Sequence, residues 1–174
     1  MTNEQNCHLL LMRHAKSDWH SGSNIDFDRP LTRRGEADAR KIAHWMYAHR
    51  LVPDVIVSSP SVRTQATAGI VVAELRQQPE LIRWEPDIYE ASLADLLEVL
   101  GKYVDQGRCL LLIGHNPGLD SLTTYLASNE PSRAASGKLM TTSALAIFSR
   151  ADNATTPGHH SLQLQQIVRA KEIN

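Results

Sequence analysis

The sequence predicts an α/β fold of three layers: a mostly parallel central sheet, helices on both of its faces and a C-terminal edge hairpin. Two observations carry this prediction. Segments with apolar residues at helical spacing alternate with short apolar runs, which is the pattern of parallel strands joined by helices. The most apolar of these runs are typical of strands buried on both faces. The predicted strands lie at 7–12, 54–57, 81–84, 109–113, 144–148 and 162–168.

The composition favours one globular domain, which we expect to span 1–174 with its core at about 7–169. Hydrophobic residues make up 42% and charged residues 21% of the chain, which argues against a disordered or fibrous protein. With 18 basic and 19 acidic residues the net charge is −1, and this balance argues against nucleic acid as a partner. No stretch has the length of a membrane span, and the first residues lack the features of a secretion signal. We therefore expect a cytoplasmic protein without membrane partners.

The first predicted strand delivers two chemically active side chains to a loop. Cys7 and the continuous run Leu9 to Met12 make this segment apolar, and Arg13-His14 follows directly. In open α/β sheets ligands bind at the carboxyl ends of strands, which makes this pair a candidate site by position. A polar loop leads from Trp19 to Pro30, and Thr32 is then predicted to cap a helix that ends before Pro53.

The second strand-to-helix turn carries an arginine. Ser59 or Ser61 can cap the helix and Pro60 fits its opening, so Arg63 lies in the first turn. Taken alone, Arg63 is more typical of an exposed surface arginine. The helical spacing predicts a buried side made of Val62, Ala66, Ile70 and Ala73.

Two later helices complete the alternation. Ser92 and Asp95 have capping-box spacing ahead of a leucine-rich stripe. The most apolar run, 109–113, ends in Gly114-His115-Asn116-Pro117, where Asn116 is predicted to cap a helix opened by Pro117. His115 then directly precedes a helix N-terminus, where free backbone N–H groups favour an anion.

Two arginines and two histidines thus come from three strand ends of one predicted sheet, and this joint pattern is more specific than any member. Arginine forks bind paired phosphate oxygens and stay charged, so Arg13 and Arg63 are predicted to clamp a phosphoryl group. A neutral imidazole can attack phosphorus and carry the phosphoryl group covalently, which makes His14 the predicted nucleophile. His115, if protonated, would donate to a phosphoryl oxygen.

Other uses of these histidines fit the sequence less well. A zinc site needs a third protein ligand, and no paired His or Cys spacing provides one. Neither glycine-rich nucleotide-binding motif occurs. We therefore expect neither a metal nor another cofactor. We assign His159-His160 to the surface, and Cys7 and Cys109 to the reduced, buried residues.

Four stretches of the chain resemble one known family: Arg13-His14-Ala15-Lys16-Ser17, Arg29-Pro30-Leu31-Thr32, Ser58-Ser59-Pro60-Ser61-Val62-Arg63-Thr64-Gln65-Ala66-Thr67 and Gly114-His115-Asn116-Pro117. The family is the histidine phosphatase superfamily, also called phosphoglycerate mutase-like, and the likeness is to its SixA-type phosphohistidine phosphatases. It runs from Leu9 to about Phe148. The resemblance implies the phosphoglycerate mutase-like fold, a phosphohistidine intermediate on His14, phosphate binding by Arg13 and Arg63, and His115 as the second active-site histidine.

Five further residues are candidates at this site. Glu90 falls where larger relatives carry an acidic proton donor, and a capping or surface carboxylate is an equal alternative. His20 stands where mutase-like relatives have a phosphate-contacting asparagine. Arg29 either adds positive potential near the site or anchors its loop. Ser17 and Asn116 belong to the matching stretches, and they are assigned to substrate binding together with His20 and Arg29.

The spacing of the chain bears on the substrate. Only 13 residues separate Arg76 from Glu90, which leaves no room for the long insertion that covers the pocket in larger small-molecule phosphatases and mutases of this superfamily. An uncovered, shallow site could admit a phosphorylated side chain of a folded protein, so we expect a protein phosphohistidine phosphatase. The alternatives are a small-molecule phosphomonoesterase of the same superfamily and a non-catalytic module that binds phosphorylated ligands.

Overall fold

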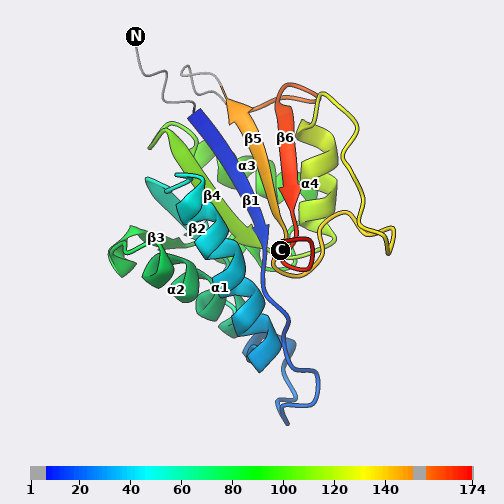
Figure 1. The fold of residues 1–174 in the computed structure, drawn as a ribbon. Coiled ribbons are helices and arrows are strands. Elements are labelled where there is room, and N and C mark those ends of the chain that lie inside the picture. The colour runs from blue at the N-terminus through cyan, green and yellow to red at the C-terminus, as the bar shows by residue number, and fades with distance from the viewer. Residues whose placement is uncertain (1–6, 151–155, 174) are drawn as a thin grey trace.

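The computed structural model describes residues 7–150 and 156–173. In this part of the chain, six strands form one sheet in the order β3-β2-β4-β1-β5-β6 (Figure 1). The pairs β1–β4, β2–β4 and β2–β3 are parallel, whereas β5 runs antiparallel to both of its neighbours. The predicted mostly parallel sheet with a C-terminal edge hairpin is therefore confirmed. The bounds are β1 Cys7–Arg13, β2 Val55–Ser58, β3 Ile82–Trp84, β4 Cys109–Gly114, β5 Leu145–Arg150 and β6 Gln163–Val168.

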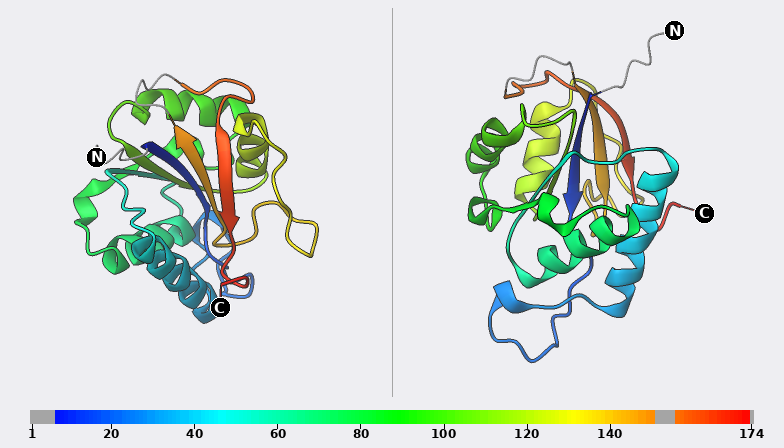
Figure 2. Two further views of the ribbon diagram at one scale, coloured as in Figure 1. Left: turned by 45° about the horizontal axis from the view of Figure 1, so that its top comes forward. Right: turned by 90° about the vertical axis from the view of Figure 1, so that its left-hand side faces the viewer.

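Helices cover both faces of the sheet, which confirms the predicted three layers. Helices α1 and α2 pack side by side on one face, and α3 and α4 cover the other (Figures 1 and 2). Short 3-10 turns lie in three of the connections. The bounds are α1 Arg33–Ala48, α2 Val62–Glu74, α3 Leu93–Tyr103 and α4 Gly118–Leu126, with η1 Asp26–Asp28, η2 Pro79–Leu81 and η3 Pro86–Ile88.

Strand β1 holds the two cores together. Leu10 and Met12 pack in the cluster with α1 and α2, while Leu9 and Leu11 pack in the cluster with α3 and α4. This division follows from the alternation of side chains along a strand. All four side chains are fully buried, and each stabilises the fold by about 1.5–3 kcal/mol relative to an exposed position. The strand that ends in Arg13 is therefore fixed from both sides.

Two helix starts form as the sequence predicts. The Thr32 hydroxyl accepts a hydrogen bond from Gly35 N, and Ser92 and Asp95 form a complete capping box. At the start of α1 the chain also packs tightly against the loop after β1. A Cβ atom on Gly35 would lie 2.2 Å from the Lys16 carbonyl oxygen, so only glycine fits there.

The predicted buried side of α2 is wrong. Val62, Ala66 and Ile70 are only half-buried and Ala73 is exposed, while the helix buries Arg63, Thr64, Thr67, Ala68, Val71 and Val72. The apolar pattern fails because the buried polar side chains have hydrogen-bond partners. The Thr64 hydroxyl donates to Ser59 O at 2.7 Å, and the Thr67 hydroxyl donates to Arg63 O and accepts from Ala15 N. Pro60 lies before the N-cap residue Ser61, outside the helix.

The start of α4 also differs from the prediction. The helix begins at Gly118 with Pro117 at the N-cap, and no side chain caps it. Asn116 instead donates from Nδ2 to the carbonyl of Met140, at 3.0 Å. The amide therefore ties the β4–α4 turn to the segment before β5, and a local capping pattern cannot reveal such a distant partner.

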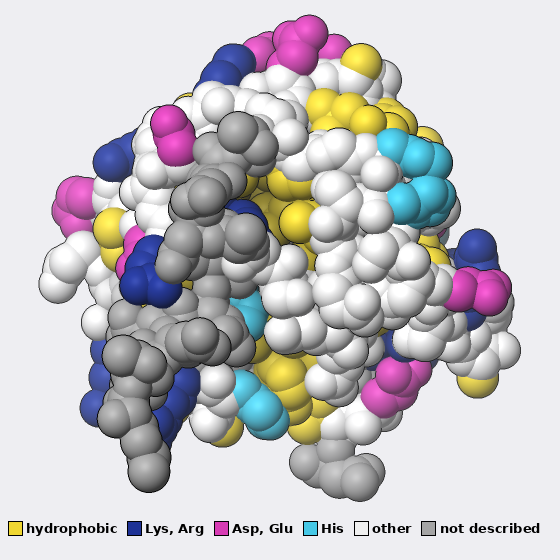
Figure 3. All heavy atoms as spheres, turned by 90° about the horizontal axis from the view of Figure 1, so that it is seen from above, with side chains coloured by type: hydrophobic (Ala, Val, Ile, Leu, Met, Phe, Trp, Pro, Cys, Tyr) yellow, Lys and Arg dark blue, Asp and Glu magenta, His cyan; other side chains and the backbone are white. Residues whose placement is uncertain are grey.

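Several further expectations can be compared with the described residues. Cys109 is buried and His159 and His160 are exposed, as predicted. Among the described residues no helix is long and apolar enough to cross a membrane. Figure 3 views the end of the molecule at which β1 begins, where basic and acidic side chains are interspersed around the margin.

Candidate active site

The predicted site residues meet at the carboxyl ends of the parallel strands. The register pairs Arg13 with Gly114 across β1 and β4, and Ser58 with Ile113 across β2 and β4. Hydrogen bonds from His14 N to Gly114 O and from Ser59 N to Ile113 O extend these ladders by one residue. A cavity of about 1150 Å³ opens at this edge, and Arg13, His14, Arg63 and His115 all line it.

His14 lies at the bottom of this arrangement with only 7% of its surface exposed. Its Nδ1 lies 2.7 Å from Ala15 O, and because a carbonyl can only accept, Nδ1 carries the hydrogen. The remaining ring nitrogen, Nε2, therefore holds the lone pair. Burial lowers the pKa of His14 to about 3, and the positive charges of Arg63 and Arg13 act in the same direction. The ring is neutral at pH 7, as a nucleophile must be.

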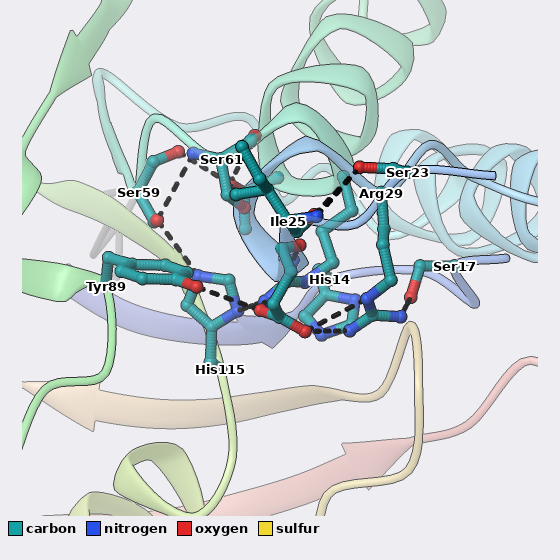
Figure 4. Close-up of polar contacts among 12 residues, drawn as sticks. His14, Ser17, Ser23, Ile25, Arg29, Ser59, Ser61, Tyr89 and His115 are labelled. Carbon is teal, nitrogen blue, oxygen red and sulfur yellow. Dashed lines mark hydrogen bonds and ion pairs between the residues drawn. The ribbon is translucent and has the colours of Figure 1, made fainter. Parts of the chain in front are cut away.

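His115 faces His14, with 5.1 Å between the ring centroids. Its Nε2 lies 2.9 Å from the Ser59 hydroxyl, and its Nδ1 lies 3.4 Å from Nη2 of Arg63 (Figure 4). Burial, followed by the charge of Arg63, lowers the pKa of His115 to about 4. The ring is therefore neutral in the ligand-free protein, and the protonated donor expected from the sequence requires an anion beside it.

Arg13 is fixed by the segment that precedes β5. Its Nη1 donates to Met140 O at 2.9 Å, the same carbonyl that accepts from Asn116. Met140 is held in turn, because its backbone N–H donates to the Asp120 carboxylate of α4. The guanidinium is thus positioned by residues more than a hundred positions away in sequence.

Arg63 is not the exposed arginine that its local sequence suggests, because it is only 4% exposed. Its Nη1 donates to the carbonyl of Asp26, and its Nη2 donates to the Asp26 carboxylate at 2.8 Å. The loop between β1 and α1 therefore folds over the first turn of α2. Asp26 lies in the η1 turn of that loop.

Arg29 is buried in the same loop and combines both predicted roles. Its Nε and Nη2 donate to Oδ1 of Asp26, its Nη1 donates to the Ser17 hydroxyl, and its guanidinium lies 3.7 Å from the centre of the Trp19 ring. These contacts make it the anchor of the loop. It also lines the cavity and adds positive charge there.

Asp26 is the site residue that sequence analysis missed. Its carboxylate accepts from Arg29, Arg63 and the Tyr89 hydroxyl, the last at 2.9 Å. Partial burial alone would raise the pKa of Asp26, but the hydrogen bonds from Arg29, Tyr89 and Arg63 outweigh it and lower the pKa to about 2. An aspartate in a polar loop normally indicates a solvated surface, and its spacing of three residues from Arg29 is the one local signal.

The remaining candidates differ in position. Ser17, Asn116 and Glu90 line the cavity, and Glu90 is exposed at its edge with a backbone φ of 54°. His20 is exposed, and the structure does not bring it to the cavity wall, because its backbone N–H is held in a turn by Asp18. Within the described ranges no group of three or more His, Cys, Asp or Glu residues could hold a metal ion.

The charge of the cavity differs from that of the whole chain. Eight Lys and Arg side chains line it against four Asp and Glu, although the chain carries a net charge of −1. Lys16, Lys138 and Lys171 contribute to this excess. Clefts lined by one sign of charge attract ligands of the opposite sign. The cavity therefore suits an anionic ligand.

The chain matches the sequence model of a known protein family. The model of the histidine phosphatase superfamily (branch 1) matches residues 9–97. The chain belongs to this superfamily. The matched region contains Arg13, His14 and Arg63, and the structure adds His115 from β4 through the pairing of β4 with β1. Membership in the histidine phosphatase superfamily supports a phosphatase activity.

Two curated relatives of this chain are described as uncharacterized proteins. An uncharacterized chloroplastic protein of Arabidopsis thaliana is 32% identical over 127 residues, which cover 68% of this chain and 58% of the plant protein. An uncharacterized protein of Mycobacterium tuberculosis is 30% identical over 117 residues, which cover 67% of this chain and 70% of the mycobacterial protein.

Solved structures support the SixA-type branch within the superfamily. A structure from Agrobacterium tumefaciens described under the name phosphohistidine phosphatase SixA has a TM-score of 0.78 and 25% identity, covering 93% of this chain and 97% of its own. The protein histidine phosphatase SixA in complex with tungstate has a TM-score of 0.77 and 20% identity, covering 96% and 99%. A mycobacterial glucosyl-3-phosphoglycerate phosphatase has the same fold, with a TM-score of 0.66 and 14% identity, covering 93% and 98%.

Proposed function

We propose that this protein is a metal-independent phosphohistidine phosphatase that removes phosphate from a histidine of a partner protein and works through a phosphohistidine intermediate on His14. The observation that carries the proposal is the neutral His14 ring beside two arginines and a second imidazole on one cavity wall. Its Nδ1 is committed to Ala15 O, which leaves Nε2 as the nucleophilic atom.

The reaction has two displacements. The lone pair of His14 Nε2 attacks phosphorus, an N–P bond forms, and the bond from phosphorus to the leaving nitrogen breaks, its electron pair staying with the leaving imidazole, which a proton neutralises. Water then attacks phosphorus, loses its proton, and the N–P bond to His14 breaks, which restores the lone pair and releases orthophosphate. Arg13 and Arg63 balance the charge of the peripheral oxygens in both steps.

The incoming dianion also changes His115. Its low pKa in the ligand-free site reflects burial and the charge of Arg63. A phosphate group would offset that charge and raise the pKa, so His115 could then donate from Nδ1 to a phosphoryl oxygen. The Nε2–H group would continue to donate a hydrogen bond to the Ser59 hydroxyl, which keeps the His115 ring in one orientation. Once a proton is on the other nitrogen of the phosphohistidine ring, the ring leaves as neutral imidazole, so it needs little help from a carboxylic acid such as Glu90.

Two features favour a protein substrate over a small molecule. Between the end of α2 and the start of α3 the chain forms only the short β3 and the turns η2 and η3, so no helical insertion covers the cavity from that side. Trp19 stands at the cavity wall with 74% of its surface exposed. Aromatic side chains are enriched at the centres of protein interfaces, so Trp19 offers a contact for a partner surface.

A comparison of substrates tests the proposal. A small phosphocarrier protein labelled on histidine should lose its phosphate faster, by kcat/KM, than sugar phosphates do. Brief exposure to the labelled carrier should leave acid-labile, alkali-stable label on the wild type. The label should be absent from His14→Ala and present on the control His20→Ala, which removes an exposed histidine outside the cavity wall.

Three other results of these experiments would contradict the proposal. A strong preference for sugar phosphates would make the protein a small-molecule phosphomonoesterase. Tight binding of the phosphorylated carrier without turnover would make it a phospho-ligand-binding module. Label on His14→Ala equal to that on the wild type would exclude His14 as the nucleophile.

A further inference from the structure

One carboxylate connects the loop over the site to the catalytic cavity. Each oxygen of Asp26 accepts two hydrogen bonds: Oδ1 from Nε and Nη2 of Arg29, and Oδ2 from Nη2 of Arg63 and from the Tyr89 hydroxyl. Its backbone carbonyl accepts a further bond from Nη1 of Arg63. The donors come from the loop itself, the first turn of α2 and the segment after η3. Asp26 is therefore the common acceptor of three separate elements.

The contacts of Arg63 show what this acceptor does. Asp26 takes one hydrogen from each terminal nitrogen of the guanidinium, through its carbonyl and its carboxylate. This two-point contact fixes the plane of the group. The same Nη2 atom lies 3.4 Å from Nδ1 of His115, so the fixed arginine reaches the second histidine. Each Nη atom carries two hydrogens, so one on Nη1 is not used by Asp26.

Free arginine side chains have high rotamer entropy, which binding of an anion would otherwise remove. An arginine that is already fixed before the anion arrives binds it without this loss. Asp26 also has both of its oxygens saturated by four donors, which makes it a poor candidate for leaving its place when an anion arrives.

From this geometry we propose that Asp26 is a positioning residue, which holds Arg63 in the orientation that binds the phosphoryl group. The proposal rests on the proposed function, because it assigns Arg63 to phosphate. It differs from a blocking role, in which the Asp26 carboxylate would compete with phosphate for Arg63. The two roles give opposite results when the carboxylate is removed.

Asp26→Asn keeps the size of the side chain and the backbone carbonyl but removes the charge. The matched control is Asp28→Asn, which removes an exposed carboxylate from the same η1 turn. Binding of inorganic phosphate is measured by calorimetry, and kcat/KM is measured on the labelled phosphocarrier. We expect Asp26→Asn to weaken phosphate binding and lower kcat/KM by about tenfold or more, because the buried Arg63 guanidinium loses a charge-assisted contact to the partly exposed Asp26 carboxylate. Asp28→Asn should match the wild type. Unchanged or tighter phosphate binding by Asp26→Asn would overturn the proposal.

A double-mutant cycle separates positioning from a general effect on the loop. If Asp26 acts through Arg63, Asp26→Asn should weaken phosphate binding far less in an Arg63→Gln background than in the wild type. Equal losses in both backgrounds would refute the proposal. The phosphate arm is independent of turnover, so a wild type that binds phosphate but leaves phosphohistidine intact would count against the proposed function and not against Asp26.

Discussion

Lowering the pH should destabilise this protein through its active-site histidines. Burial holds the pKa of His14 at about 3 in the folded protein, whereas an unfolded histidine titrates near 6.5. Between these values the unfolded chain binds a proton that the folded chain does not, so the free energy of unfolding falls as the pH falls. Each pH unit is worth about 1.4 kcal/mol, so going from pH 7 to pH 4.5 should cost about 2–3 kcal/mol through His14 alone.

Urea unfolding at pH 7 and at pH 4.5 measures this cost. The His14→Gln variant lacks the titrating ring. Its free energy of unfolding should therefore fall by about 2–3 kcal/mol less than that of the wild type when the pH is lowered from 7 to 4.5. The control His20→Gln removes an exposed histidine and should follow the wild type. A His14→Gln variant that loses stability in parallel with the wild type would refute the reasoning that His14 is buried and neutral.

Three substitutions test other parts of the structure. Arg63→Lys keeps a charge but loses the planar fork, so kcat/KM on the labelled carrier should fall about 10- to 100-fold, and kinetics like those of the wild type would argue against a clamp. Ser59→Ala removes the acceptor of His115 Nε2–H, and a loss of about 2- to 10-fold in kcat/KM is expected, whereas no change would show that the ring needs no such support. Gly35→Ala places a methyl group against Lys16 O and should lower the free energy of unfolding by about 1–3 kcal/mol in urea; an unaffected midpoint would contradict the close packing described above.

The architecture followed from patterns that are local in sequence. A short continuous apolar run such as 109–113 favours a strand buried on both faces, and it forms the central strand β4. Capping signals at Thr32 and Ser92 likewise depend on neighbours within three residues, and both are formed. The convergence of Arg13, His14, Arg63 and His115 on one cavity also followed, because parallel strands place their carboxyl ends at the same edge.

Two of the errors concern residues whose partners are distant in sequence, and one concerns buried polar residues. Asn116 was expected to cap its own helix, but its partner is the Met140 carbonyl. The buried side of α2 was misjudged because threonines with hydrogen-bond partners bury as readily as apolar residues, which an apolar count cannot detect. Asp26 was missed because its partners Arg63 and Tyr89 are 37 and 63 positions away in the sequence.

The register between β1 and β4 determines how far apart the His14 and His115 rings lie. Arg13 stands opposite Gly114, and the two imidazoles follow one residue later on each strand. Sliding one strand by a single residue would turn its side chains to the other face, and sliding it by two would displace them by about 6.6 Å. That displacement exceeds the 5.1 Å between the rings of His14 and His115. A single added residue within β1 or β4 that shifts this register would therefore separate the pair.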